Sequence, residues 1–290
     1  MDKSHSNKNS YAFIDIHSHL HDTAFKDDRE ELLKEMKEYG LATITVGTDL
    51  YESSNAVALA QAHDNVYATI GLHPADNVTE EFDQEAFTTL LLENTKIIAI
   101  GECGLDYHYI ENFFERDIKE KGLTHNKDAE ADRQQGIFEE QVRFACEHNL
   151  PLMLHGRPSK GSMDAYEDML HILENAKKEY GTKLRGNAHF FVGNIDIAKR
   201  FVDIGFTMSF SGVITFTKDY DDVVRYLPIT MIQAETDSPY ATPAPFRGKR
   251  NSPMYVQEIV AKIAVLRNEP FEEVRVQLLE NAKRIFDLTL

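Results

Sequence analysis

The segment FIDIHSHL (residues 13–20) combines an apolar run with two histidines at its end. A short run of this kind is typical of a strand that is buried in a parallel sheet. Side chains two residues apart on an extended strand point to the same side, so His17 and His19 can chelate one cation through neutral imidazoles. Two histidines at a strand end can equally make hydrogen bonds and bind no metal. Whether these histidines bind a metal depends on which residues stand at the ends of the other strands.

The unit of an apolar run followed by a helical pattern recurs along the chain. Strands are expected at residues 11–16, 41–46, 66–70, 96–100, 150–154, 185–189, 205–210 and 230–235. Helices are expected at residues 28–39, 53–63, 80–93, 133–148, 163–180, 194–204, 253–267 and 271–286. This α/β alternation fits a (β/α)8 TIM barrel, and it also fits an open doubly wound sheet.

Length and composition favour one domain. The chain has 290 residues, of which 42% are hydrophobic, which excludes disorder as the dominant state. We expect residues 1–10 to form a flexible leader and residues 11–290 to form the barrel domain. No apolar run approaches the ~18 residues of a membrane helix, the leader lacks the apolar core of a secretory signal, and two cysteines make no disulfide framework. We therefore expect a cytoplasmic protein that does not bind membranes, and no feature indicates a protein partner.

The charge balance limits how nucleic acids can bind. With 31 basic and 48 acidic residues, the formal net charge is −17. This balance disfavours a general polyanion-binding surface, and a DNA or other nucleic-acid substrate would bind weakly. Such a substrate would be held by metal ions or by a few Arg and Lys side chains at the site.

Ligand-type residues occur at the ends of five expected strands. Each one alone has an ordinary structural explanation, such as a capping carboxylate or a hydrogen-bonded histidine. In a barrel, however, all strand ends converge on one mouth, and chance placement of the whole set there is improbable. Imidazole and carboxylate groups are common ligands of divalent transition metals. The sequence therefore predicts a binuclear metal site, with the candidate ligands His17, His19, Glu102, His155, His189 and Asp237.

The chain resembles the TatD family of metal-dependent hydrolases, which are amidohydrolase-type barrels. The resemblance extends from Phe13 to about Phe286 and implies a TIM barrel with its site at the C-terminal ends of the strands. It rests on six motifs in order: FIDIHSHL (13–20), IGLHP (70–74), IGECGLDY (100–107), LMLHGR (152–157), AHFF (188–191) and ETDSPY (235–240).

The resemblance also divides the ligands between two divalent cations, which Glu102 bridges. It implies that the first cation is held in addition by His17, His19 and Asp237, and the second by His155 and His189. His73 in the IGLHP motif would contact a substrate phosphate, or alternatively serve as a structural histidine held by Pro74. Histidine-rich ligation suits Zn, Mn, Ni or Fe better than Mg. The family nevertheless includes Mg-supported nucleases, so the identity of the cations (Zn, Mg or Mn) stays open.

TatD-like enzymes suggest hydrolysis of DNA phosphodiester bonds, probably exonucleolytic, at single-stranded or frayed ends. Glu102 and Asp237 would be the catalytic carboxylates, with Asp237 taking a proton from a metal-activated water. Arg157 would bind phosphate or, alternatively, form a surface ion pair. The same metal site also suits a D-aminoacyl-tRNA deacylase or another ester, amide or phosphoester hydrolase. A non-catalytic scaffold is disfavoured because all ligand candidates are present.

Some segments depart from the usual family pattern. Residues 108–132 and 157–162 look longer than usual, and Phe190 and Phe191 replace a polar pattern; we expect all three to lie at the barrel mouth and to affect substrate preference. Tyr107 and Tyr240 are expected to pack at the barrel rim or, alternatively, to stack on a base or bond a phosphate. Asp15 is expected to orient the imidazole of a metal-binding histidine. Asp106 is expected to cap the loop that follows it or to brace a metal ligand. Cys103 is expected to be a packed, uncharged thiol.

Overall fold

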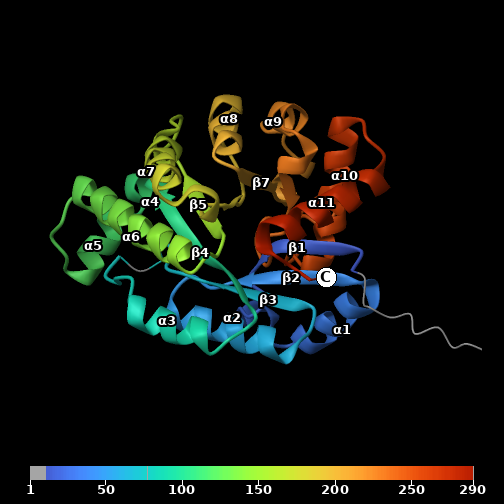
Figure 1. The fold of residues 1–290 in the computed structure, drawn as a ribbon, viewed down its shortest axis with the longest axis horizontal. Coiled ribbons are helices and arrows are strands. Elements are labelled where there is room, and N and C mark those ends of the chain that lie inside the picture. The colour runs from blue at the N-terminus through green and yellow to red at the C-terminus, as the bar shows by residue number, and fades with distance from the viewer. Residues whose placement is uncertain (1–10, 77, 290) are drawn as a thin grey trace, which may run out of the picture.

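The computed structural model describes residues 11–76 and 78–289, which form a parallel barrel wrapped by helices (Figure 1). The eight strands are hydrogen-bonded in chain order, from β1 to β8. Ser18 at the end of β1 pairs with Ser238 beyond β8, so the sheet almost closes on itself. This order confirms the TIM barrel and excludes the doubly wound sheet, whose strand order reverses at a switch point. The strands are β1 Phe13–Ser18, β2 Leu41–Val46, β3 Val66–Ile70, β4 Ile97–Asp106, β5 Leu152–Arg157, β6 Gly186–Ala188, β7 Phe206–Phe210 and β8 Ile232–Ala234.

Every expected helix is present, but some begin at other residues than expected: α6 begins six residues earlier and α3 four residues later. The helices are α1 Arg29–Tyr39, α2 Leu50–Ala62, α3 Gln84–Leu92, α4 Tyr107–Asn112, α5 Phe114–Lys121, α6 Lys127–Glu147, α7 Asp164–Tyr180, α8 Ile195–Asp203, α9 Asp221–Tyr226, α10 Val256–Arg267 and α11 Phe271–Phe286. Helix α2 begins earlier than expected because Asp49 caps it by accepting the Glu52 N–H. Helices α4, α5 and α9 were not expected; α4, α5 and the start of α6 occupy the segment 108–132, which was interpreted as a loop. The expected leader, residues 1–10, lies outside the described residues.

Strand β4 is longer than the sequence pattern predicts. It continues to Asp106 because β5 pairs with it over its whole second half, where Gly104 lies opposite His155. Gly104 has φ +148°, and a Cβ atom there would clash with the carbonyl oxygen of His155. The glycine thus lets the two strands approach closely. As a result Glu102 lies within β4 rather than after it.

Helix α11 covers the seam between the first and last strands. Its side chains Ile285 and Phe286 belong to one buried cluster with Ile14 and Ile16 of β1. The buried Asn281 of α11 donates hydrogen bonds to the carbonyls of Ile229 and Ile232, at 2.7 and 2.8 Å. One side chain therefore holds the start of β8 to the helix that closes the barrel. Among the described residues, no helix is long and apolar enough to cross a membrane.

Replacing Asn281 with Ala should lower the free energy of unfolding by about 2–3 kcal/mol, since two buried carbonyls lose their donor. Urea unfolding followed by circular dichroism measures this change. The control is Val276→Ala on the same helix, where 47% of the side chain is exposed and a change within about 0.5 kcal/mol is expected. Equal stability of both variants would show that the contact does not support the seam.

Candidate metal centre

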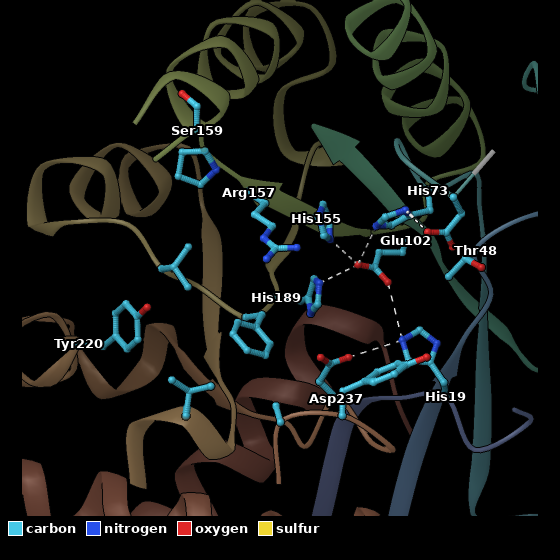
Figure 2. A pocket seen from close by; sticks show the side chains of 18 of the residues that line it. His19, Thr48, His73, Glu102, His155, Arg157, Ser159, His189, Tyr220 and Asp237 are labelled. Atoms are coloured by element: carbon cyan, nitrogen blue, oxygen red, sulfur yellow. Dashed lines mark hydrogen bonds and ion pairs between the residues drawn. The ribbon is translucent and has the colours of Figure 1, made fainter. Parts of the chain in front are cut away.

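The buried carboxylate of Glu102 lies at the centre of the barrel mouth (Figure 2). Its Oε1 is 2.7 Å from His155 Nδ1 and 2.7 Å from His189 Nε2. Its Oε2 faces the other side, 3.4 Å from His17 Nε2 and 3.9 Å from His19 Nε2. The two oxygens of one carboxylate are thus divided between two pairs of histidines.

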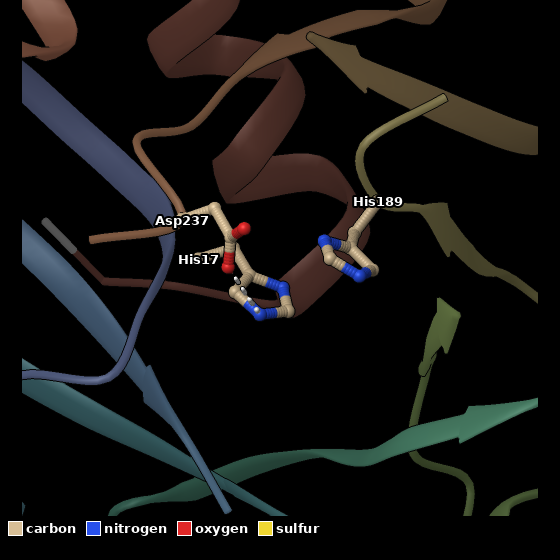
Figure 3. A group of neighbouring side chains, drawn as sticks. All are labelled: His17, His189 and Asp237. Carbon is tan, nitrogen blue, oxygen red and sulfur yellow. Dashed lines mark ion pairs between the residues drawn. The ribbon is translucent and has the colours of Figure 1, made fainter. Parts of the chain in front are cut away.

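Asp237 completes the side of the cluster that contains His17 and His19. Its Oδ1 is 3.5 Å from His19 Nε2 and 3.8 Å from His17 Nε2. The backbone N–H of Asp237 donates to the His17 carbonyl at 2.9 Å, which fixes the two chain segments side by side. Figure 3 shows Asp237 and His189 close to the ring of His17, and the two imidazoles stack with centroids 3.9 Å apart.

Three of the imidazoles are oriented by a group at their other nitrogen. The partners are Asp106 Oδ2 for His155 (3.1 Å), Glu235 Oε1 for His189 (3.3 Å) and the Val46 carbonyl for His19 (2.9 Å). Carboxylates and carbonyls in this position fix the ring and its tautomer around metal-binding histidines. Asp106 also caps α4 by accepting the Tyr109 N–H, so it both caps this helix and braces His155.

The expected role of Asp15 is wrong. Its carboxylate makes no hydrogen bond with a described imidazole; it accepts the N–H and O–H of Thr236, at 2.8 and 2.6 Å, and the backbone N–H of His17, at 3.3 Å. The Nδ1 atom of His17 has no hydrogen-bond partner among the described residues. Asp15 therefore holds the segment that leads into Asp237. The reason is the geometry of the closed barrel, which brings β1 and the end of β8 together.

The protonation states follow from this crowding. Burial would raise the pKa of Glu102, but the charges of His189 and His17 and a hydrogen bond from His155 hold that pKa well below its usual range. Burial and the nearby His189 lower the pKa of His17 to about 4. Against the effect of burial, Asp106 and Glu102 raise the pKa of His155 to about 9. A cation that binds here must therefore displace the proton of His155.

These donors fit divalent metal ions. Ligand atoms lie within 4.8 Å of one another in three overlapping groups, which are His17 with His19 and Glu102, His17 with His189 and Asp237, and His73 with Glu102 and His155. Imidazole nitrogens and carboxylate oxygens are the donors that divalent transition metals take in proteins. The cluster is therefore able to hold metal.

His73 lies at the edge of the cluster, after β3. Its Nδ1 contacts Asp76 Oδ1 at 2.8 Å, and its Nε2 lies 3.8 Å from Glu102 Oε1. The Pro74 carbonyl beside it is held by Arg133 of α6, whose guanidinium donates at 2.7 Å. His73 is thus positioned firmly, with one nitrogen directed at the Glu102 carboxylate.

The cluster opens into a pocket of about 980 Å³. Arg157 lines this pocket and reaches toward His155 and His189 (Figure 2). It has no ion pair with any described residue, so the surface ion pair considered for it is not formed. Tyr240 also lines the pocket and is 58% exposed, so the expectation that it packs into the rim is wrong.

The unusual segments lie in different places. Residues 157–162 line the pocket as expected, but no described residue of 108–132 does. That segment supports the pocket from outside, because Glu111 accepts the backbone N–H of Lys160 at 3.0 Å. Phe190 lines the pocket, whereas Phe191 is 2% exposed and packs against Tyr166, Phe201 and Phe210 in the core.

The other expected packing roles are as predicted. Tyr107 is buried and donates to Asp168 at 2.7 Å, and Cys103 is fully buried, which raises the pKa of its thiol. Glu235 was missed by sequence reasoning, although its charge directly after a buried strand was a usable signal. It accepts from the Phe190 N–H at 2.7 Å and from the Ser209 hydroxyl at 2.5 Å.

Comparison with known proteins agrees with this geometry. The sequence model of the family described as "TatD related DNase" matches residues 14–287. The chain belongs to the TatD family. This TatD chain is 34% identical over 276 residues to the uncharacterized metal-dependent hydrolase YabD of Bacillus subtilis (strain 168), with 94% of this chain and 98% of YabD covered. It is 31% identical over 281 residues to the uncharacterized metal-dependent hydrolase YcfH of Escherichia coli (strain K12), covering 95% and 96%.

Solved structures agree as well. The crystal structure of the TatD homolog YjjV from Escherichia coli K12 superposes with a TM-score of 0.80 at 27% identity, covering 96% of this chain and 98% of that one. A TatD family hydrolase from Entamoeba histolytica has a TM-score of 0.76 at 20% identity, covering 96% and 98%, and supports the fold alone.

Asp106→Asn should weaken metal binding by roughly 10–100-fold, because His155 loses its charged orienting partner. An Asn still caps α4, so the fold should be retained. Competition with a chromophoric chelator measures the affinity. The control is Asp117→Asn, which removes a carboxylate that accepts from the Tyr109 hydroxyl on α4 and should leave the affinity unchanged. An unchanged affinity in Asp106→Asn would exclude this role.

Proposed function

We propose that this TatD-family chain is a metal-dependent hydrolase that cleaves phosphodiester bonds at DNA ends with two divalent cations. The observation that carries the proposal is the divided carboxylate of Glu102, whose two oxygens face two different histidine pairs. A carboxylate in that position is suited to bridge two ions.

The same distances support the division of ligands that the family resemblance implies. One cation would be held by His17, His19 and Asp237 with Glu102, and the other by His155 and His189 with Glu102. When bound, two divalent cations neutralise the charge of a phosphodiester and lower the pKa of an attacking water. The identity of the ions, Zn, Mn or Mg, follows from loading experiments rather than from the donor set.

Asp237 is the carboxylate placed to accept the proton of the attacking water. Both side chains line the pocket, but that of Asp237 is 15% exposed and that of Glu102 only 5%. Asp237 has φ +53°, a conformation that non-glycine residues rarely adopt, and its N–H bond to the His17 carbonyl holds it there. Arg157 would pair with the non-bridging phosphate oxygens, and His73 would face the substrate through Nε2.

Asp237→Asn should reduce kcat by at least about hundredfold, the usual effect of removing a general base. The cation held by Glu102, His155 and His189 should remain, so about half of the metal content is expected. Turnover and metal stoichiometry of the same preparation check both statements. Near-wild-type turnover with metal loaded would exclude Asp237 as the base.

The activity is tested with single-stranded oligonucleotides labelled at the 5′ or the 3′ end, incubated with Zn, Mn or Mg. A ladder of products is expected with the wild type, and its dependence on the labelled end gives the direction of digestion. Chelation of the metal and Glu102→Ala should both abolish the ladder. Absence of cleavage by protein shown to carry metal would refute the nuclease proposal and favour ester hydrolysis, such as deacylation of D-aminoacyl-tRNA.

A further inference from the structure

The charged side chains that line the pocket are divided between two walls. Asp22, Glu52 and Asp76 come from the segments after β1, at the start of α2 and after β3. The cationic side chains Arg157 and Lys160 follow β5. Because the strands are ordered from β1 to β8 around the barrel, the segments after β1–β3 lie across the mouth from those after β5–β7. Figure 2 accordingly places His73 and Thr48 on the far side of Glu102 from Arg157 and Tyr220.

A third cation joins the basic wall from the segment after β8. The guanidinium of Arg247 lies 4.0 Å over the ring of Phe216, which is 46% exposed, and both residues line the pocket. One of its N–H groups donates to the Thr242 carbonyl at 3.2 Å. Within the described part of the chain, no carboxylate oxygen lies within 4.0 Å of a charged nitrogen of Arg157, Lys160 or Arg247. In a chain with a net charge of −17, three cations without acidic partners share one wall of one pocket.

The pair of Arg247 and Phe216 is built into the scaffold. The segment that carries Arg247 is joined to that of Phe216 by a bond from the Ala244 N–H to the Thr215 hydroxyl, at 2.8 Å. The same segment is closed by a bond from the Thr242 hydroxyl to the Lys249 carbonyl, at 2.7 Å. Phe246 within it stacks on Tyr255, with centroids 4.0 Å apart. The guanidinium and its aromatic support are therefore held in place before any ligand arrives.

Resting on the proposed function, we infer that this wall forms a subsite for the nucleotide that adjoins the scissile phosphate. Its base stacks on the pair of Arg247 and Phe216, and its own phosphate pairs with Lys160, while Arg157 pairs with the scissile phosphate. Nucleobases stack on aromatic rings and on guanidinium planes alike, and this mode tolerates different bases. An acidic protein binds nucleic acid only weakly without sequence preference, and this subsite adds affinity at one place.

The acidic side chains of the opposite wall restrict a bound polynucleotide to one side of the cluster. A phosphate placed near Asp22, Glu52 and Asp76 would meet like charge, whereas on the basic wall it meets unpaired cations. A polynucleotide can therefore leave the cluster over Arg247 but not over the acidic wall. The scissile bond then lies next to a chain end, and the subsite holds the strand that remains attached.

The test compares Arg247→Gln with Arg247→Lys, which keeps the charge but loses the planar group. Both should lower kcat/KM for a hexathymidylate by about tenfold relative to that for the p-nitrophenyl ester of thymidine 5′-phosphate, which has no adjoining nucleotide. On a hexamer with an abasic site at the adjoining position, neither variant should differ from wild type by more than about twofold. Lys249→Gln, which removes a cation two residues away that does not line the pocket, should leave the ratio unchanged.

The outcomes separate the subsite from the nuclease activity. Wild-type ratios in both Arg247 variants would overturn the subsite while the nuclease proposal stands. Full rescue by Arg247→Lys would overturn stacking, because charge alone would then suffice.

Binding gives a second readout, measured by fluorescence anisotropy of labelled hexathymidylate with the Asp237→Asn protein. If no variant cleaves but adding Arg247→Gln weakens binding about tenfold, the subsite is supported and the nuclease proposal fails. Equal binding with and without Arg247→Gln overturns the subsite.

Discussion

The site depends on one buried carboxylate that is surrounded by imidazoles. Glu102 lies on β4, yet its contacts come from β1, β5 and the end of β6, so it connects strands across the barrel mouth. A charge so deeply buried is tolerated because its partners are cationic or able to bind a cation with it. Other contacts of the barrel position those partners. The close pairing of β4 with β5 at Gly104 brings His155 near Glu102, and the hydrogen bond from the Asp237 N–H to the His17 carbonyl holds β1 beside the segment after β8.

Helix α6 holds the strands of the site in place. Its buried face carries polar side chains that hold backbone groups of neighbouring strands. Gln134 accepts the N–H of Asp106 at 2.8 Å, and Gln141 exchanges two hydrogen bonds with Leu72 just before His73. Buried amides of this kind are stable only when their bonding capacity is used, so their presence specifies one arrangement of the site strands.

The barrel was predictable because buried parallel strands leave an unambiguous pattern of apolar runs between amphipathic helices. The candidate ligands were predictable because they stand at strand ends, where a barrel brings side chains together. Asp15, Glu235 and Gln134 show the limit of such reasoning. Their partners are distant in sequence, and no local period distinguishes a carboxylate that orients a histidine from one that holds a backbone segment. The placement of Phe191 in the core and of residues 108–132 outside the pocket likewise depends on tertiary packing.

The contact between Ser18 and Ser238 has a consequence for biosynthesis. Because the mouth is assembled from the first strand and from the segment after the last, a nascent chain that has not yet emerged as far as Asp237 has only part of the ligand set. Helix α11, which seals the same seam, is made later still. A ribosome-bound intermediate therefore cannot assemble the full set of candidate metal ligands, and the complete site forms only after the last strand and helix α11 have been made.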